Sequence, residues 1–446
     1  MPIKLNKVRI DLLLATGSDF CQKLVGYVVL MVLARYLDKA TMGDFFFATA
    51  AALILARFAE LGTNRYLMRE VAEQPEHSRA RLGEVLALRV PLLVVAFIAL
   101  NGLIAVLSPD ILSIVALTSC YVFLNELFYP FAAFFVGHRR VGLRAATALS
   151  GQALMIGLVL LAVSQGWGVH AILACYIIAN VVLVGTAYVV VLSMFGTIHW
   201  HWAFDGLWRV LKVSLPLFVL ALLGLLHFKI DTIMLEFIAT GVDNTPSEEV
   251  ARYEAAYKIF EVSQVLARPL AMIFLPICSG LVVQAAWPRL RAQVRKLALL
   301  AATAGGAMAL GVITLAPWII PFMFGDQYLD SVTVLRVLYL GVPSLYLVFV
   351  GTFLCNALRL ERRAIIAMIL CLVCNAALNA MSIPAYGAVG AAWVTLATES
   401  LLAALLWGVL IQRLRELPAE GGEPTAPQSP PVGAAGAAGA AGGAAS

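Results

Sequence analysis

The chain has 446 residues, of which 62% are hydrophobic and 13% are charged, and its formal net charge is +5. A soluble domain could not bury so much apolar surface, so the composition excludes an ordinary soluble protein and indicates many membrane-buried helices. The positive charge is spread over short segments between apolar runs, which argues against a nucleic-acid-binding face.

Twelve apolar runs are long enough to cross a bilayer, which takes about 20 residues of helix. The first begins within "MPIKLNKVRIDLLLATG", which lacks a small-residue cleavage site and therefore predicts a membrane helix rather than a signal peptide. The predicted spans are 11–34, 43–61, 84–107, 111–136, 142–164, 169–194, 213–238, 253–282, 295–322, 332–357, 362–382 and 388–411.

The basic residues alternate between the connections of these spans. With the N-terminus inside, the inner connections carry most lysines and arginines, whereas the outer loops hold only Arg35, Lys39 and Arg252. This is the distribution of the positive-inside rule, so both termini are predicted to be cytoplasmic.

Two segments differ from the spans. Residues 197–212 mix Trp200, Trp202 and Trp208 with basic residues, which favours an amphipathic helix lying in the inner membrane interface. The tail from 417 to 446 is rich in Pro, Gly and Ala and is predicted to be disordered.

A weak internal repeat relates "MGDFFFATA" at 42–50 to "VARYEAAYK" at 250–258, about half the chain apart. It predicts an all-α membrane fold of about 12 helices, six in each half of the chain. The predicted division is a first bundle at 1–196, the interfacial linker at 197–212, a second bundle at 213–416 and the tail at 417–446.

The chain has seven cysteines, all in apolar stretches. Cys371 and Cys374 have the spacing of a redox or zinc pair, but no second pair or nearby histidines accompany them. We therefore predict no metal site, no cofactor and no catalytic residues.

Charged side chains at membrane depth are costly and should face the interior of the bundles. Asp19 and Lys23 are four residues apart, with Tyr27 one turn further on. Lys258, Glu261 and Arg268 form one stripe of a helix. Such groups could bind cargo or could neutralise one another and hold the bundles together. The substrate-binding candidates are Lys23, Lys229, Lys258, Arg268, Arg336, Tyr27 and Tyr339, and the coupling or charge-pair candidates are Asp19, Glu126, Asp231 and Glu261.

The stretch "HFKIDTIMLE" places Lys229 and Asp231 two residues apart on a helix, which puts them on nearly opposite sides. One of these faces is expected to line the cavity and the other to meet a neighbouring helix.

Several stretches together resemble the oligosaccharide flippases of Wzx type, within the multidrug/oligosaccharidyl-lipid/polysaccharide (MOP) exporter superfamily. The chain departs from that family's D-x-x-x-L-G pattern, because Glu236 stands in place of the glycine and the loop at 239–252 is long and acidic. The matching stretches are "LARYLDKATMGDF" (33–45), "FAELGTNRYLMREVA" (58–72), "DTIMLEF" (231–237), "YEAAYKI" (253–259), "FGDQYLDSVTVLRVL" (324–338) and "IPAYGAVGAAWVTLATE" (383–399).

The resemblance implies two six-helix bundles around a central cavity. It also implies a flippase in the bacterial cytoplasmic membrane that moves undecaprenyl-diphosphate-linked oligosaccharide to the outer leaflet by alternating access. Membrane lipids and a polysaccharide polymerase or assembly protein are the implied partners, and nucleic acid is not. Two other functions stay open. One is a cation-coupled multidrug exporter of the same superfamily. The other, which the absence of a large outer catalytic loop disfavours, is a membrane glycosyltransferase or polymerase.

Overall fold

The computed structural model describes residues 5–198 and 204–418, and within them the side chains outside 5–16, 19, 204–217, 219–221, 265–273 and 275–276. These residues are almost entirely helical and contain no strand. Three short 3-10 turns, η1 (Pro75–His77), η2 (Pro109–Ile111) and η3 (Asp326–Tyr328), join some of the helices. The helices are α1 (Leu5–Tyr36), α2 (Lys39–Glu60), α3 (Thr63–Glu73), α4 (Ser78–Leu107), α5 (Leu112–Gly137), α6 (Val141–Ser164), α7 (Val169–Phe195), α8 (Phe204–Ile238), α9 (Pro246–Val283), α10 (Trp287–Phe324), α11 (Ser331–Leu340), α12 (Val342–Ala357) and α13 (Glu361–Glu416).

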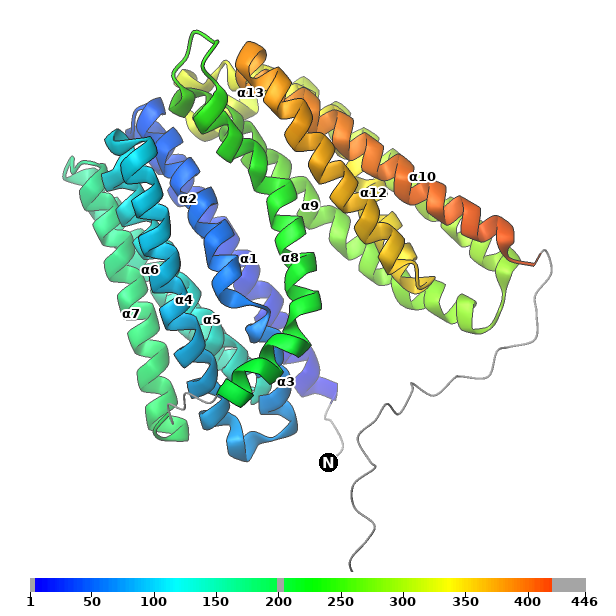
Figure 1. Cartoon of the computed structure of the whole chain (residues 1–446), viewed down its shortest axis with the longest axis horizontal. Helices are drawn as coiled ribbons and strands as arrows, with labels where there is room; N and C mark the ends of the chain where they lie inside the picture. Colours follow the sequence, from blue (N-terminus) through cyan, green and yellow to red (C-terminus); the bar gives the residue numbers. More distant parts are fainter. Residues whose placement is uncertain (1–4, 199–203, 419–446) are drawn as a thin grey trace, which may run out of the picture. The chain divides into compact units, whose positions relative to one another are not determined.

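Every predicted span but the tenth falls on one helix or part of one, which confirms the all-α membrane fold (Figure 1). Within the described residues, seven helices are long and apolar enough to cross a membrane, or eight if α11 and α12 count together. The last two predicted spans lie in α13, whose helical geometry is interrupted at Gly387 with a φ of 53°. The predicted tenth span is two helices rather than one, because α11 ends at Gly341 and Pro343, in the first turn of α12, has no N–H to continue α11.

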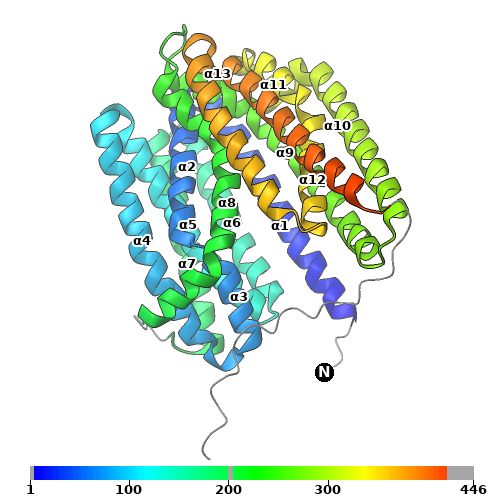
Figure 2. The same cartoon turned by 45° about the vertical axis from the view of Figure 1, so that its right-hand side comes forward.

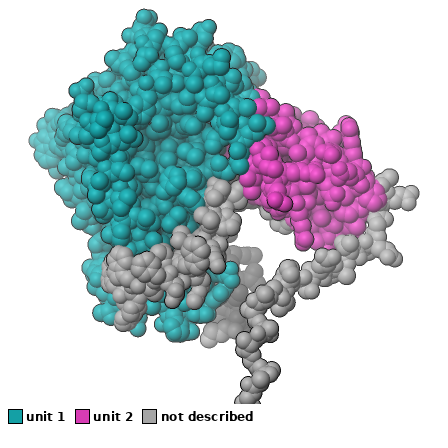
Figure 3. Space-filling view, in the orientation of Figure 1, with its two compact units in different colours: residues 1–261, 310–341, 368–398 teal, residues 262–309, 342–367, 399–446 magenta. Residues whose placement is uncertain are grey.

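The chain forms two compact units (Figure 3). Unit 1 contains residues 1–261, 310–341 and 368–398, and unit 2 contains residues 262–309, 342–367 and 399–446. The chain therefore passes from one unit to the other within α9 and α10, between α11 and α12, and twice within α13. The division into two six-helix bundles stays a prediction, as does the interfacial helix, because residues 199–203 and the side chains of 204–212 lie outside the part of the chain that the structure describes.

One hydrophobic cluster of unit 1 consists of aromatic side chains of α5 packed against α3, α4 and α7. Phe131, Phe134 and Phe135 are almost fully buried and contact aliphatic side chains such as Leu67 and Leu86. Because lipid is as apolar as these side chains, close van der Waals packing, rather than escape from water, stabilises the contacts between the helices here.

Arg89 on α4 is a charged group among these apolar side chains, with 1% of its surface exposed. Its Nη1 donates a hydrogen bond of 3.1 Å to the carbonyl oxygen of Glu126, and its Nη2 donates one of 2.9 Å to Oγ1 of Thr63. A buried guanidinium with such partners costs much less than an unpaired one. Arg89 lies within the predicted span 84–107, and the structure places its side chain inside the protein.

Helix α8 packs against α2, so segments far apart in the sequence lie side by side in unit 1 (Figures 1 and 2). The rings of Phe47 on α2 and Phe237 on α8 meet edge to face with centroids 5.5 Å apart. One turn earlier on α2, a Cβ added to Gly43 would lie 1.7 Å from the carbonyl oxygen of Ser247 at the start of α9. Glycine is therefore needed where α2 approaches α9.

Unit 2 is held by α10, α12 and the end of α13. The indole of Trp407 donates a 3.0 Å hydrogen bond to the carbonyl oxygen of Leu347, and the hydroxyl of Tyr346 lies 3.1 Å from the sulfur of Met308. Arg291 donates to the carbonyl oxygens of Leu414 and Leu417, so the end of α13 has partners for its last carbonyl groups.

Candidate functional site

Unit 1 contains a cavity of about 400 Å³, lined by side chains from α1, α2, α5, α6, α7, α8 and α9. This volume lies within the range of small-molecule sites. The lining has two chemically different sides. One, from α1, α8 and α9, carries all the lysines and glutamates of the lining, and we call it the charged wall. The other, from α2, α5, α6 and α7, has polar and aromatic side chains but no acid or base, and we call it the neutral wall.

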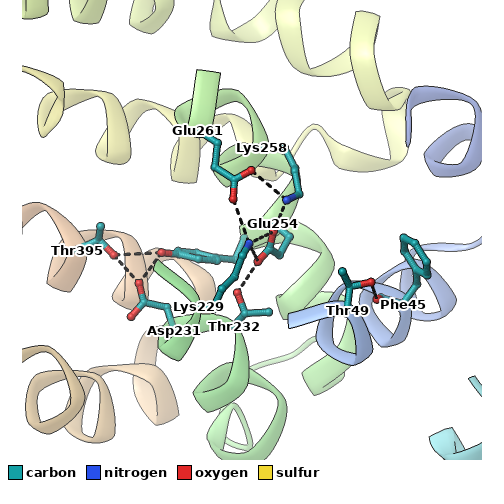
Figure 4. Close-up of polar contacts among 10 residues, drawn as sticks. Phe45, Thr49, Lys229, Asp231, Thr232, Glu254, Lys258, Glu261 and Thr395 are labelled. Carbon is teal, nitrogen blue, oxygen red and sulfur yellow. Dashed lines mark hydrogen bonds and ion pairs between the residues drawn. The ribbon is translucent and has the colours of Figure 1, made fainter. Parts of the chain in front are cut away.

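The centre of the charged wall is a quartet formed by Lys229, Glu254, Lys258 and Glu261 (Figure 4). The Nζ of Lys229 lies 3.1 Å from a carboxylate oxygen of Glu254 and 3.1 Å from one of Glu261. The Nζ of Lys258 lies 3.1 Å from Glu261 and 3.7 Å from Glu254. Each carboxylate is thus shared by two lysines.

Helical periodicity explains how the quartet forms. Glu254, Lys258 and Glu261 are spaced by four and three residues on α9, so they share one face of the helix. Lys229 reaches this face from α8, and its Nζ also lies 5.3 Å above the ring of Tyr257. The hydroxyl of Thr232 donates a 2.5 Å hydrogen bond to Glu254.

The quartet is neutral as a whole, because two ammonium groups face two carboxylates. Lys23 on α1 is the third lysine of the lining, so the described lining residues carry three lysines and two glutamates and one net positive charge. Tyr27, one turn from Lys23, donates a 3.3 Å hydrogen bond to the carbonyl oxygen of Lys258. This contact fixes α1 against α9 beside the cavity.

Asp231 lies outside the cavity lining and forms a separate polar cluster. Its carboxylate accepts hydrogen bonds of 2.7 Å from Tyr253, 2.8 Å from Thr395 and 2.6 Å from Asn379. The amide of Asn379 also donates to Asn375 at 3.0 Å. Asp231 thus joins α8 to α9 and α13, while Lys229, two residues earlier, faces the cavity.

The other candidate residues lie elsewhere. Arg336 is exposed and donates a 3.2 Å hydrogen bond to the carbonyl oxygen of Ile313. Tyr339 is buried and donates to the carbonyl oxygen of Ile259 at 2.9 Å. Glu126 is buried on α5 and does not line the cavity. The side chains of Asp19 and Arg268 lie outside the described residues.

Sequence reasoning overlooked Glu254, although its spacing from Lys258 was the available signal. It also overlooked the neutral wall as a unit, because Gln152, Tyr176 and Asn180 come from α6 and α7, whereas Tyr121 comes from α5. Nothing in a single sequence brings these helices together. The seven cysteines are free thiols, and the described residues contain no group of three His, Cys, Asp or Glu side chains placed to hold a metal.

A second charged network lies at the end of the helices predicted to face outward. Lys39 contacts Asp330 at 2.5 Å, and Arg252 lies 3.5 Å from the same carboxylate. Arg252 also contacts Glu249 at 3.2 Å, and Glu249 accepts a 2.6 Å hydrogen bond from the backbone N–H of Ala388 beside Gly387. These contacts connect the starts of α2, α9 and α11 with the break in α13.

Solved structures with the same fold are membrane transporters. A multidrug resistance MATE family transporter of the MOP superfamily, inward-facing, is similar with a TM-score of 0.69 and 16% identity over 89% of this chain and 96% of that chain. The lipid II flippase MurJ, in an inward closed conformation, has a TM-score of 0.68 and 15% identity over 91% and 90%. A MOP superfamily transporter from Pyrococcus furiosus has a TM-score of 0.59 and 15% identity over 92% and 95%.

These similarities define the class: the chain is a multi-pass membrane protein with the fold of MOP superfamily transporters. No curated protein sequence matches it. Residues 11–282, more than half of the chain, match the family model described as polysaccharide biosynthesis protein, and the chain belongs to this family. The resemblance to the Wzx-type flippase family, inferred from the sequence motifs, is thereby confirmed.

Proposed function

We propose that this protein is a flippase that moves undecaprenyl-diphosphate-linked oligosaccharide from the inner to the outer leaflet of the bacterial cytoplasmic membrane. The observation that carries the proposal is the cavity, whose lining combines three lysines, two glutamates and an uncharged polar wall inside an apolar helical protein. A diphosphate requires cations, an oligosaccharide requires hydrogen-bonding groups, and a polyprenyl chain can remain in lipid. This cavity offers both cations and hydrogen-bonding groups.

The family and fold comparisons support this substrate class. The matched family is named for polysaccharide biosynthesis, and MurJ, with the same fold, is named a lipid II flippase. In this proposal the protein performs no covalent chemistry, the two bundles open alternately to each side, and both termini are cytoplasmic. Reporter fusions test the orientation: positions 75, 140, 290 and 362 are expected to report cytoplasm and positions 40, 166, 245 and 326 the exterior.

Within the proposal, Lys23, Lys229 and Lys258 contact the diphosphate, and Arg268 is a further cationic candidate. Arg336 and Tyr339 are retained as candidates for another conformation of the transport cycle, because neither lines the cavity of the present one. Asp19, Glu126, Asp231 and Glu261 remain the proposed charge-pair or coupling groups. A polysaccharide polymerase or assembly protein is the proposed acceptor of the released cargo.

Reconstitution tests the function directly. Purified protein in liposomes containing undecaprenyl-diphosphate-linked oligosaccharide is expected to move the sugar to the opposite leaflet, where an external glycosidase releases it. Lys258→Ala should slow this movement, whereas Lys258→Arg, which keeps the charge, should retain most of it. Ser150→Ala is the control, because the Ser150 hydroxyl donates to the carbonyl oxygen of Thr147 on its own helix. If Ser150→Ala abolishes the movement as well, the effect of Lys258→Ala reflects general damage to the fold rather than loss of a contact with the lipid.

The similarity to MATE transporters favours a second candidate, a cation-coupled multidrug exporter. In that function a carboxylate such as Asp231 or Glu126 would exchange a proton or sodium ion. Deletion of the gene would then raise drug susceptibility and leave surface polysaccharide unchanged. The flippase proposal predicts the reverse: loss of surface polysaccharide, accumulation of lipid-linked oligosaccharide and unchanged drug susceptibility.

A further inference from the structure

The neutral wall of the cavity combines aromatic rings with amide side chains and contains no charge. Phe45, Tyr121 and Tyr176 come from three helices and meet in one cluster. The rings of Phe45 and Tyr121 are nearly parallel, with centroids 6.2 Å apart and an interplanar angle of 19°. The ring of Tyr176 lies 5.0 Å from that of Tyr121 and 6.3 Å from that of Phe45. All three rings line the cavity.

The amides of the neutral wall are held in fixed orientations. Asn125 on α5 donates a 2.8 Å hydrogen bond to the side-chain oxygen of Asn180 on α7. Asn180 in turn donates to the carbonyl oxygen of Tyr176 at 2.8 Å. This chain of donors sets which end of each amide faces which neighbour, so the wall presents an ordered hydrogen-bonding surface before any ligand arrives.

Gln152 on α6 is the one amide of this wall with an unused buried acceptor. Its Oε1 is buried and accepts no hydrogen bond from any residue that the structure describes, although the side chain lines the cavity. A buried acceptor left without a donor is costly, so groups of this kind are usually satisfied when the site is filled. Rotation of the Gln152 amide toward the cavity would let a hydroxyl group of a ligand supply the missing donor.

Rings beside ordered amides are suited to a particular ligand chemistry. A pyranose has an apolar C–H face that packs on aromatic rings and a rim of hydroxyl groups that donate and accept hydrogen bonds. A diphosphate would gain little on this side, because its charge has no cation there. An apolar lipid chain would bury the Asn125, Asn180 and Gln152 amides without satisfying them.

We propose that the neutral wall is the sugar subsite of the cavity and that it binds an uncharged pyranose close to the diphosphate. The inference rests on the proposed flippase function and adds a preference for uncharged sugars to it. A neutral hexose or N-acetylhexosamine fits the wall, whereas a uronic acid would place its carboxylate against a surface without a cation. Phe45, Tyr121 and Tyr176 stack on the ring, and Gln152, Asn125 and Asn180 contact its hydroxyl groups.

The test measures binding of defined lipids to the full-length protein in nanodiscs, by competition with fluorescent undecaprenyl diphosphate. The probes are undecaprenyl diphosphate alone and the same lipid carrying one glucose, galactose, N-acetylglucosamine, N-acetylgalactosamine or glucuronate. One hydrogen bond contributes about 2- to 12-fold in affinity. At least one neutral sugar is therefore expected to tighten binding about fivefold or more over the bare lipid, and glucuronate is not.

Two variants assign the gain to the wall. Gln152→Leu keeps the side-chain size and removes the acceptor, and Tyr121→Leu removes the ring. Each should reduce the gain from the sugar at least about threefold and leave binding of bare undecaprenyl diphosphate unchanged. The matched control is Ser150→Ala on the same helix, which should change neither. Lys258→Ala should weaken binding of all probes by a similar factor.

The outcomes separate the two proposals. If the bare lipid binds but none of the four neutral sugars tightens its binding, the sugar subsite is wrong and the flippase proposal stands. If Gln152→Leu and Tyr121→Leu weaken the bare lipid as much as the sugar-bearing lipid, the wall is structural and the subsite is again wrong. If no undecaprenyl diphosphate lipid binds at all, the proposed function fails and the subsite fails with it.

Discussion

Replacement of Lys229 with methionine tests how strongly the quartet holds α8 to α9. Methionine keeps a long unbranched side chain but removes the charge. The side chains of Lys229 and Glu254 are 8% and 2% exposed, so their ion pair lies in the interior of unit 1. After the substitution, Glu254 retains the hydroxyl of Thr232 at 2.5 Å and the ammonium of Lys258 at 3.7 Å.

Removing one partner of a buried ion pair costs about 3–5 kcal/mol. Because Glu254 keeps two other partners, we expect Lys229→Met to lower the free energy of unfolding by an amount near the lower end of this range, about 3 kcal/mol. The double variant Lys229→Met with Glu254→Gln leaves no unpaired carboxylate and should recover at least half of this loss. It also keeps the net charge of the described lining, since two lysines then face one glutamate instead of three facing two.

Thiol reactivity provides the assay. Cys175, Cys278, Cys355 and Cys371 are buried free thiols, so a thiol-reactive fluorophore labels them when the helices separate. Equilibrium unfolding in mixed detergent micelles should give the order wild type, double variant, single variant, from most to least stable. Glu361→Gln, on an exposed side chain at the start of α13, is a control that should shift the midpoint little.

The reasoning about the quartet is refuted if the single and double variants are equally unstable, because Glu254 would then gain nothing from its lysine. Flipping assays on the double variant add independent information. Retained transport would mean that the net charge of the lining matters more than Lys229 itself. Lost transport at normal stability would assign Lys229 a direct contact with the diphosphate.

Three further changes probe the end of the helices predicted to face outward. Asp38 caps α2 by accepting a hydrogen bond of 2.9 Å from the backbone N–H of Thr41, the third residue of the helix. Burial acts to raise the pKa of Asp38, but the hydrogen bonds to its carboxylate outweigh burial and lower the pKa. Asp38→Ala should cost about 1 kcal/mol at neutral pH. The difference from wild type should begin to shrink below about pH 4, where an unfolded aspartate becomes protonated, and should vanish as the pH falls through the lower pKa of the folded carboxyl. Gly387→Ala should cost about 1–3 kcal/mol, because its φ of 53° disfavours a side chain and an added Cβ would meet a carboxylate oxygen at 2.2 Å. Gly408→Ala, inside the same helix and with open space around it, should instead stabilise by up to about 1 kcal/mol in the same unfolding measurement. The charge swap Lys39→Asp with Asp330→Lys should restore part of the transport that Lys39→Asp alone impairs; recovery is incomplete because Arg252 also loses its carboxylate partner. No recovery at all would argue against a role for the Lys39–Asp330 pair.

Much of the fold could be predicted because each membrane span is recognisable from a run of consecutive residues. Each span needs a long apolar run, and charged residues concentrate in the loops between spans. The twelve spans could therefore be predicted from the length of the apolar runs and the placement of charge. The interruptions in the last helices were harder to predict. Gly387 stands inside an apolar run, and only the tertiary contacts of the break, such as the hydrogen bond from Ala388 to Glu249, distinguish it from an ordinary helix glycine. At Gly341 the nearby Pro343 is a local signal, which the sequence analysis did not use.

The charged wall was partly predictable for a related reason. Residues three and four apart on a helix share a face, so spacing alone is enough to group Lys258 with Glu261. Lys229 could be placed on the opposite side of its helix from Asp231 by the same geometry. Which carboxylates Lys229 meets depends on how α8 packs against α9. The neutral wall depends on the packing of α2, α5, α6 and α7, which cannot be predicted from the spacing of residues within one helix.

The pairing within the quartet has a consequence for transport. If the diphosphate of a cargo enters the cavity, it competes with Glu254 and Glu261 for the same two lysines. Binding then exchanges one set of ion pairs for another, so the net gain is much smaller than two unpaired lysines would give. A transporter benefits from this limit, because a cargo held too tightly would not be released on the other side. Lys23, which lies outside the quartet, then supplies the net attraction, while the sugar subsite supplies the selectivity.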